Sequence, residues 1–339
     1  MAALGDNNLN LHDISRRQNP DGSISTIIEQ MSDEDPILDD MVVRVCNDGT
    51  NHISTIRTGL PTATWRQLNA GVARSKSQTA QASDTTGMLE AYSEVDKDLI
   101  DLEDNRLAAR ASEDSAFLES MRQTMATTLF YGDTTVNPGR FTGLAPRYAT
   151  PAATKTASGY NMIDGGSGSS SATTSLWLIG WGDKSVHGLI PKGLAAGFNV
   201  TDLGEHTLVD ENGDYYQGLR THFKWNLGFT VRDWRYVVRI CNIEVADLVS
   251  NSGAANLTRL MTQAEHRIQS LTGVRAVWYG NRTTRTYLQT QTTEKANVNL
   301  TFDNVTGKPI MHTSSGVPFR VNDALLNTET NIAGTFASV

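Results

Sequence analysis

The chain of 339 residues lacks the features that mark disulfide-bonded, secreted or membrane-spanning proteins. It has only two cysteines, Cys46 and Cys241, and they lie far apart in the sequence. No apolar run approaches the roughly 18 residues of a transmembrane helix. The first residues, MAALGDNNLNLHD, lack the basic start and apolar stretch of a signal peptide. We therefore expect two free thiols in a reducing cytoplasm and no contact with a membrane.

Positive charge and apolar residues are also scarce. Lys and Arg number 29 against 37 Asp and Glu, which gives a formal net charge of −8 at pH 7. Because affinity for nucleic acid comes mostly from cations that neutralise phosphates, this balance argues against a surface that binds nucleic acid as a whole, although it permits a local basic face. Hydrophobic residues make up 39%, which is low for a compact globular chain. A chain that buries part of its apolar surface between subunits would have this composition.

Catalytic and metal-binding patterns are missing as well. GWGDKS lacks the GxxxxGK[ST] spacing of a phosphate-binding loop, and no GxSxG nucleophile elbow occurs. The seven histidines show neither HExxH nor a metal-ligand spacing with the cysteines. The carboxylates from Asp33 to Asp40 predict a solvated acidic patch, with cation binding as the alternative. We expect no catalytic residue, no metal and no cofactor.

The most regular segment is LRTHFKWNLGFTVRDW, from Leu219 to Trp234. Its apolar side chains fall on odd positions and its basic ones on even positions, so a strand would place the two sets on opposite faces. After Asp233 the apolar residues move to even positions, which indicates a bulge or a bend. The basic face would meet solvent or a neighbour's carboxylates; a surface that faces phosphate is the alternative.

Helical periodicity is clearest over residues 104–131, where apolar side chains recur at steps of three, four or seven. Gly132 follows this stretch and is suited to a left-handed cap. A second helix is predicted from Asn256 to Leu271, and a third over TTRTYLQTQTT.

Two hairpins and an arm complete the outline. Asn212-Gly213 lies between β-prone runs and predicts a tight hairpin. Residues 53–95 have β-prone flanks around a small polar middle, which predicts a longer hairpin. The segment before residue 53 is too polar for a domain and contains a short helical stretch that we expect to stop near Pro36.

Several long blocks resemble the major capsid proteins of tailed bacteriophages, and more narrowly those of short-tailed phages of enterobacteria. The blocks are TTLFYGD followed by FTGLAPRY, then SLWLIGWGDKSVHGLIPKGLAAGF, DLGEHTLVDENGDYYQGLRTHFKWNLGFTVRDWRYVVRICNI and GVPFRVNDALLNTET. The resemblance implies an α+β, HK97-like capsid fold. It also implies a structural subunit of an icosahedral phage head rather than an enzyme. Such subunits self-assemble into hexamers and pentamers that enclose double-stranded DNA without sequence-specific binding.

The resemblance also divides the chain into named parts. They are an N-terminal arm (1–52), an extended loop (53–95), a peripheral domain (96–240) with a spine helix (104–131), an axial domain (about 241–312), and a C-terminal strand and tail that return to the peripheral domain (313–339). The extended loop would lie across the next subunit and add contacts there.

Candidate residues for contacts between subunits follow from this assignment. They lie in the loop and on the alternating strand: Arg74, Lys76, Gln78, Thr85, Arg220, His222, Lys224 and Arg232. The expected location is the virion, after assembly in the host bacterial cytoplasm. Candidate partners besides further copies are a decoration or cement protein, a scaffold protein and a portal protein. The alternatives are a phage tail, connector or decoration protein that forms rings or trimers, and an unrecognised cytosolic enzyme.

Overall fold

A computed structural model describes most of the chain as an α+β protein. The described residues are 35–101, 106–166, 172–193, 197–210, 212–250, 255–268, 270–271, 273–294, 301–303, 310–313 and 315–337. They form two compact units. The larger unit lies within Glu34–Gly87, Ala126–Leu194 and Gly228–Val339, and the smaller one includes Met88–Met125 and Ala195–Leu227. Strand β3 (Gln78–Asp96), helix α4 (Arg106–Tyr131) and strand β8 (Tyr215–Val231) each contribute residues to both units.

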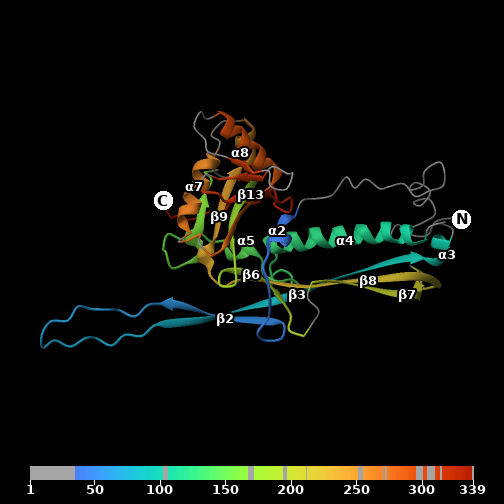
Figure 1. Cartoon of the computed structure of the whole chain (residues 1–339), viewed down its shortest axis with the longest axis horizontal. Helices are drawn as coiled ribbons and strands as arrows, with labels where there is room; N and C mark the ends of the chain where they lie inside the picture. Colours follow the sequence, from blue (N-terminus) through green and yellow to red (C-terminus); the bar gives the residue numbers. More distant parts are fainter. Residues whose placement is uncertain are drawn as a thin grey trace. The chain divides into compact units, whose positions relative to one another are not determined.

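The larger unit is built on a mixed sheet whose strands follow the order β11-β12-β13-β10-β5-β6-β8-β3-β2. Its remaining elements, in chain order, are α2 (Pro36–Asp40), β1 (Val43–Val45), β2 (Asn51–Gly59), α5 (Leu144–Arg147), η1 (Ser158–Asn161), β4 (Met162–Asp164), β5 (Thr173–Trp181), β6 (Val186–Ile190), η2 (Trp234–Tyr236), β9 (Val237–Glu244), α6 (Val245–Ser250), α7 (Leu257–Arg267), β10 (Arg275–Gly280), α8 (Arg282–Glu294), β11 (Thr301–Asp303), β12 (Ile310–His312) and β13 (Pro318–Val321). Figure 1 shows β9 and β13 beside helices α7 and α8.

The core of the larger unit surrounds β5, which is buried at every residue. This strand lies between β9 and β10, so its backbone is paired on both edges. Leu176 and Leu178 join a cluster that includes Met261 of α7 and Leu288 of α8. Trp177 instead lies near Phe130 of α4, with ring centroids 6.4 Å apart. Because both faces are covered, a nearly continuous apolar run is what this strand requires.

The smaller unit has a strand pair with a helix against one face. Strands β7 (Phe198–Val209) and β8 pair antiparallel, and α3 (Lys97–Asp101) follows β3. Phe223 of β8 lies between Phe117 of α4 and Phe198 of β7, with ring centroids 6.1 and 6.0 Å away. The odd-numbered face of β8 therefore covers the helix, as the alternation predicts.

Most predicted elements are confirmed. The periodicity over 104–131 corresponds to α4, and α8 and both hairpins are present. Asn256 caps α7 by accepting a hydrogen bond from the Arg259 N–H, although this helix ends at Arg267, short of Leu271. Residues 1–34 of the predicted arm lie outside the described residues.

One local prediction differs from the structure. Gly132 does not have a positive φ; it is needed because a Cβ there would lie 2.5 Å from the carbonyl oxygens of Thr128 and Phe141. The shift of phase near Asp233 agrees with the bend rather than the bulge of the two predicted alternatives: the chain bends at Arg232, and η2 separates β8 from β9. Pro36 begins helix α2, as its fixed φ and missing N–H allow at a first helical position, and the helical stretch expected to stop near it falls within residues 1–34, outside the described residues.

Candidate inter-subunit surface

The basic face of β8 meets carboxylates of the same chain. Arg220 lies 2.5 Å from Glu94 of β3, and Lys224 lies 2.7 Å from Glu90. His222 also lies 3.4 Å from Glu90. The hydrogen bond from Lys224 is the main reason that the pKa of Glu90 falls below its usual range. Three of the predicted contact residues are thus paired within the smaller unit.

Aromatic contacts add to these ion pairs between β8 and β3. The ring of His222 stacks on Tyr92, with centroids 4.5 Å apart, and the Arg220 guanidinium lies 5.7 Å from the centroid of the same tyrosine. This face therefore presents charges of both signs and a half-exposed Tyr92, 47% accessible. Such a face suits contact with protein better than contact with phosphate, because its cations are already paired.

An arginine that sequence reasoning missed ties α4 to the strands of the smaller unit. Arg110 donates to Asp202 of β7 at 2.6 Å and to the Thr221 hydroxyl of β8 at 2.7 Å. Its guanidinium lowers the pKa of Asp202. The side chain of Arg110 is only 17% exposed. No sequence signal separated this arginine from the other charged residues on the polar face of the helix.

The β2–β3 hairpin holds the four other loop candidates. Its strands pair from Asn51 opposite Thr85 to Gly59 opposite Gln78, with a register shift between Arg57 and Gly59. Every residue over 60–81 is exposed, including Arg74 and Lys76. Thr85 is exposed as well, near the root of the hairpin. The remaining candidate, Arg232, follows β8 in the larger unit and is also exposed.

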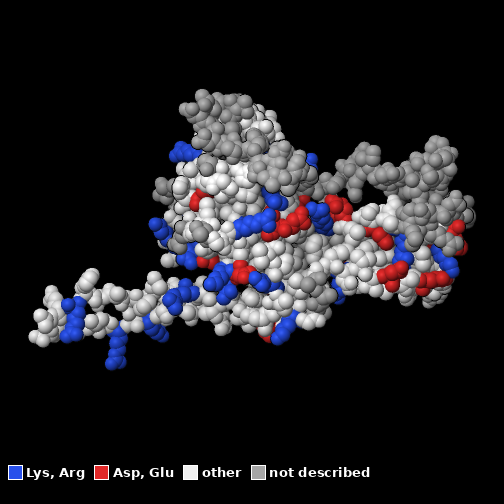
Figure 2. Space-filling model, in the orientation of Figure 1, with Lys and Arg blue, Asp and Glu red and all other residues white. Residues whose placement is uncertain are grey.

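The tip of this hairpin is both cationic and apolar. Figure 2 shows Lys and Arg along it and no Asp or Glu on the visible face. The sequence explains this, since no acidic residue occurs between Asp48 and Asp84. Large apolar side chains are fully open there: Trp65 is 105% exposed and Leu68 is 95% exposed. Sequence reasoning identified the cations but overlooked these two apolar residues.

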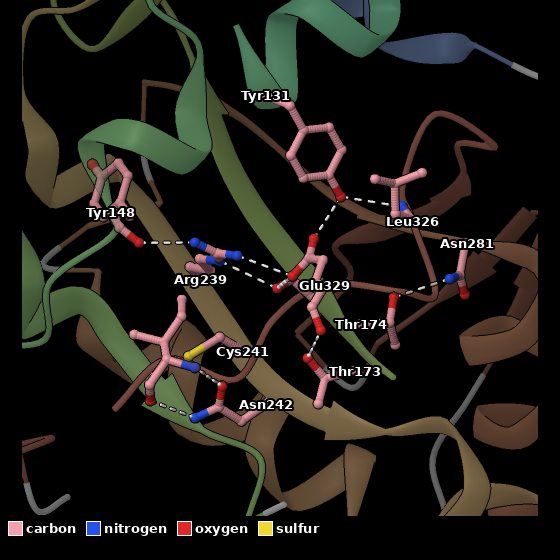
Figure 3. A network of polar contacts seen from close by, with 12 residues as sticks. Tyr131, Tyr148, Thr173, Thr174, Arg239, Cys241, Asn242, Asn281, Leu326 and Glu329 are labelled. Carbon is pink, nitrogen blue, oxygen red and sulfur yellow. Dashed lines mark hydrogen bonds and ion pairs between the residues drawn. The ribbon is translucent and has the colours of Figure 1, made fainter. Parts of the chain in front are cut away.

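A buried polar network in the larger unit is the arrangement that most resembles a catalytic centre (Figure 3). Glu329 accepts hydrogen bonds from Tyr131 and Ser175, and Arg239 donates to it at 2.9 Å. Arg239 also donates to the Tyr148 carbonyl oxygen. Burial, reinforced by the Glu329 charge, raises the pKa of Tyr131.

This network fastens the chain rather than presenting a reactive group. Both carboxylate oxygens of Glu329 are occupied, and its backbone exchanges hydrogen bonds with that of Thr173 in β5. Its role is to hold the C-terminal tail on the central sheet.

A second buried acid holds helix α2. Asp40 accepts a hydrogen bond from the Tyr279 hydroxyl and lies 2.6 Å from Arg275 and 3.3 Å from Arg320. The predicted solvated acidic patch is therefore wrong for Asp40, whose side chain is fully buried. It is wrong for Asp35 too, which is 1% exposed. The buried carboxylate of Asp40 is stabilised by Arg275 of β10 and Arg320 of β13, which are distant in sequence.

Other expected features can be compared with the described part of the chain. Cys46 and Cys241 are both free, as predicted, and both are buried. Over the described residues, no three His, Cys, Asp or Glu side chains gather as metal ligands would. None of the described helices has the length and hydropathy of a membrane span.

Comparisons with known proteins give consistent matches. A family model described as major capsid protein GP7 matches residues 19–333. Among solved structures, a chain from the cryo-EM structure of bacteriophage Epsilon15 is 33% identical, with a TM-score of 0.78, and the match covers 98% of this chain and 99% of that chain. No curated protein sequence matches.

Two weaker structural matches have lower identity. A chain from Microbacterium phage Oxtober96 is 12% identical, with a TM-score of 0.42, covering 68% of this chain and 98% of that chain. The SrpI encapsulin of Synechococcus elongatus is 11% identical, with a TM-score of 0.39, covering 69% of this chain and 96% of that chain.

Proposed function

The chain belongs to the major capsid protein GP7 family, and from that membership we propose that its copies associate into hexamers and pentamers through the β2–β3 hairpin. The fold is the α+β, HK97-like capsid fold. The protein is the structural subunit that forms the icosahedral shell of a phage head, and it is located in the virion. It is not an enzyme.

The observation that carries the proposed role of the hairpin is the exposure of its tip. Trp65 and Leu68 gain nothing from the folding of their own chain, because both are almost completely exposed. Burying one such side chain contributes about 1.5–3 kcal/mol. A neighbouring subunit that covers both side chains would gain this burial, so we infer that the tip reaches its low-energy state only in the assembly.

Charge supports a second copy of the chain as the occupant. The tip carries Arg66, Arg74 and Lys76 without an acid, whereas the chain as a whole has a net charge of −8. A neighbour of the same sequence therefore attracts the tip. Many such weak contacts, repeated around a closed shell, give a stable lattice by multivalency.

The division of the chain into parts follows the one that the resemblance to phage capsid proteins implies. We propose an arm over residues 1–52, a loop over 53–95, a peripheral domain over 96–240, an axial domain over about 241–312, and a returning tail over 313–339. The β2–β3 hairpin, helix α4 and the cluster of α7 and α8 support the middle three. The predicted contact residues Arg220, His222 and Lys224 contact a neighbouring subunit through the face of mixed charge that they form with Glu90, Tyr92 and Glu94 of β3.

We also propose that the shell encloses double-stranded DNA without reading its sequence. The ion pairs of Arg220 and Lys224 support this, since paired cations hold phosphates weakly. A scaffold protein, a portal protein and a decoration or cement protein are the further partners that such a shell requires or accommodates.

Electron microscopy of the purified chain tests the hairpin. In one variant an Asn-Gly turn replaces residues 61–76, which removes the tip but keeps β2 and β3. We expect circular dichroism and thermal stability close to those of the unaltered chain, but no closed particles. A matched control, Thr62→Ala with Ser77→Ala, alters exposed neutral residues and should still give closed particles.

Point variants refine the same test. Trp65→Ala with Leu68→Ala should reduce particle yield through lost burial, and Arg74→Ala with Lys76→Ala should reduce it more at low than at high salt. Closed particles from the tip deletion at the yield of the unaltered chain would refute the role of the hairpin. Rings or trimers from the unaltered chain would instead favour a connector-like assembly.

A further inference from the structure

A row of polar side chains crosses four neighbouring strands where the β2–β3 hairpin joins the sheet of the larger unit. His52 of β2 lies opposite Asp84 of β3, and Thr230 of β8 lies opposite His187 of β6. The Thr230 hydroxyl donates to Asp84, which links the two pairs. Directly opposite residues of antiparallel strands share a face, so all four side chains project to the same side.

The two histidines meet over this row. Their ring centroids are 5.6 Å apart, and the rings are nearly perpendicular. His187 is 2% exposed. The Nδ1 atoms of both rings are buried without a hydrogen-bond partner in the described structure. Burial lowers the pKa of His187 below its usual value, and the neighbouring His52 and Arg232 lower it further.

The nearby carboxylates are already occupied. Asp84 receives Arg147 at 2.7 Å on one oxygen and Thr230 on the other. Asp183, in the turn before β6, receives the Arg44 guanidinium on both oxygens. Asp183 and the Gly182 backbone are the groups that favour a proton on His187, and they do not outweigh burial. A proton on the His187 ring therefore has no free counter-charge.

We propose that this row is a pH-sensitive joint at the root of the hairpin. Protonation of His187 separates the two rings and loosens the contacts that hold β2 and the first part of β3 to β8 and β6. The hairpin then gains freedom at its base while the central strands of the larger unit stay packed. The consequence for assembly rests on the proposed function of the hairpin; the joint itself does not.

The direction of the pH effect follows from linkage. In the closed joint His187 binds a proton less readily than a histidine in water, whose pKa is about 6.5. The open joint therefore takes up more protons once the pH falls below about 6.5. The ratio of open to closed joint should rise by about tenfold per pH unit between that value and the lowered pKa of His187, and above this window it should not depend on pH.

Hydrogen exchange of the full, unassembled chain tests the joint. Peptides that cover 51–59 and 78–87 should lose protection from pH 7.5 to pH 5.0, after correction for intrinsic exchange rates, while peptides of β5 and β9 keep theirs. His187→Gln should remove most of this pH dependence. The matched control is His206→Gln, an exposed histidine of β7, which should leave it unchanged.

A second variant covers the case in which His187→Gln fails to fold. His52→Gln removes the neighbouring ring and should also reduce the pH dependence. Equal protection at both pH values in the unaltered chain, or the same pH dependence in the folded glutamine variants, would overturn the proposal. Particle yield against pH is a separate measurement: a joint that opens while shells form normally would contradict the role of the hairpin in assembly and leave the joint standing.

Discussion

Removing the Glu329 carboxylate should be one of the most damaging single changes in the larger unit. Glu329→Ala leaves the Arg239 guanidinium, 5% exposed, without its counter-charge. It also leaves the hydroxyls of Tyr131 and Ser175 without their acceptor. Loss of one partner from a buried ion pair costs about 3–5 kcal/mol. Because the hydroxyls can turn to other acceptors, we expect the total to stay near the upper end of that range.

The assay is equilibrium unfolding of the unassembled subunit in guanidinium chloride, followed by circular dichroism and tryptophan fluorescence. A double-mutant cycle with Arg239→Met and Glu329→Leu separates the pair from its surroundings. We expect each single variant to be severely destabilised and the double variant to recover much of the loss, because two apolar side chains need no counter-charge. Glu205→Ala, which removes an exposed partner of Lys97, is the control and should leave the midpoint unchanged.

Two results would refute this reasoning. A loss below about 1 kcal/mol for Glu329→Ala would place the cost in the range of exposed pairs and mean that the network is solvated. A double variant as unstable as the sum of the two single variants would mean that Glu329 and Arg239 act independently. In the second case the tail would be held by the backbone pairing of Glu329 with Thr173.

Two further predictions concern the helix and the thiols. Ser120→Pro should cost about 3 kcal/mol or more because proline removes a backbone hydrogen bond inside α4, whereas Ser120→Ala, at the same exposed position, should be neutral in thermal unfolding. Dithiothreitol should not change the melting temperature, since Cys46 and Cys241 are unpaired. Alkylation of Cys241 should be slow at pH 8, because burial raises the pKa of its thiol to about 12. A melting temperature that falls on reduction would contradict the assignment of free thiols.

The sequence predicts those parts of the fold that depend on periodicity. The spacing along α4 and the alternation along β8 each identify an element. The alternation identifies the buried face of β8 only in part, because both faces are buried from Asn226 to Val231. Periodicity does not identify the partner strand, because any neighbour of suitable pattern satisfies it. The pairing of Glu90 and Glu94 with the basic face of β8 therefore became visible only in the structure. Glu90 and Glu94 both fall on even-numbered positions of β3 and so share one face of that strand. This spacing was the sequence signal that could have indicated the pairing.

Buried charges were the least predictable part of the structure. Asp40 occurs in a run of acids, which locally indicates solvent, yet it is neutralised by Arg275, which is 235 residues away in sequence. Glu329 is one of two acids in the tail, with Asp323, and nothing nearby marks it as the partner of Arg239. Such pairs follow from the strand order of the whole sheet, which no short segment encodes.

The two buried acids also have a mechanical consequence. Asp40 fastens the start of the described chain to β10 and β13, and Glu329 fastens its end to β5 and β9. In the sheet β5 pairs with β9 and β10, and β10 pairs with β13. Tension on either end is thus carried directly into the same group of strands. We expect a stretched shell to part at the seams between subunits before any subunit unravels from its ends.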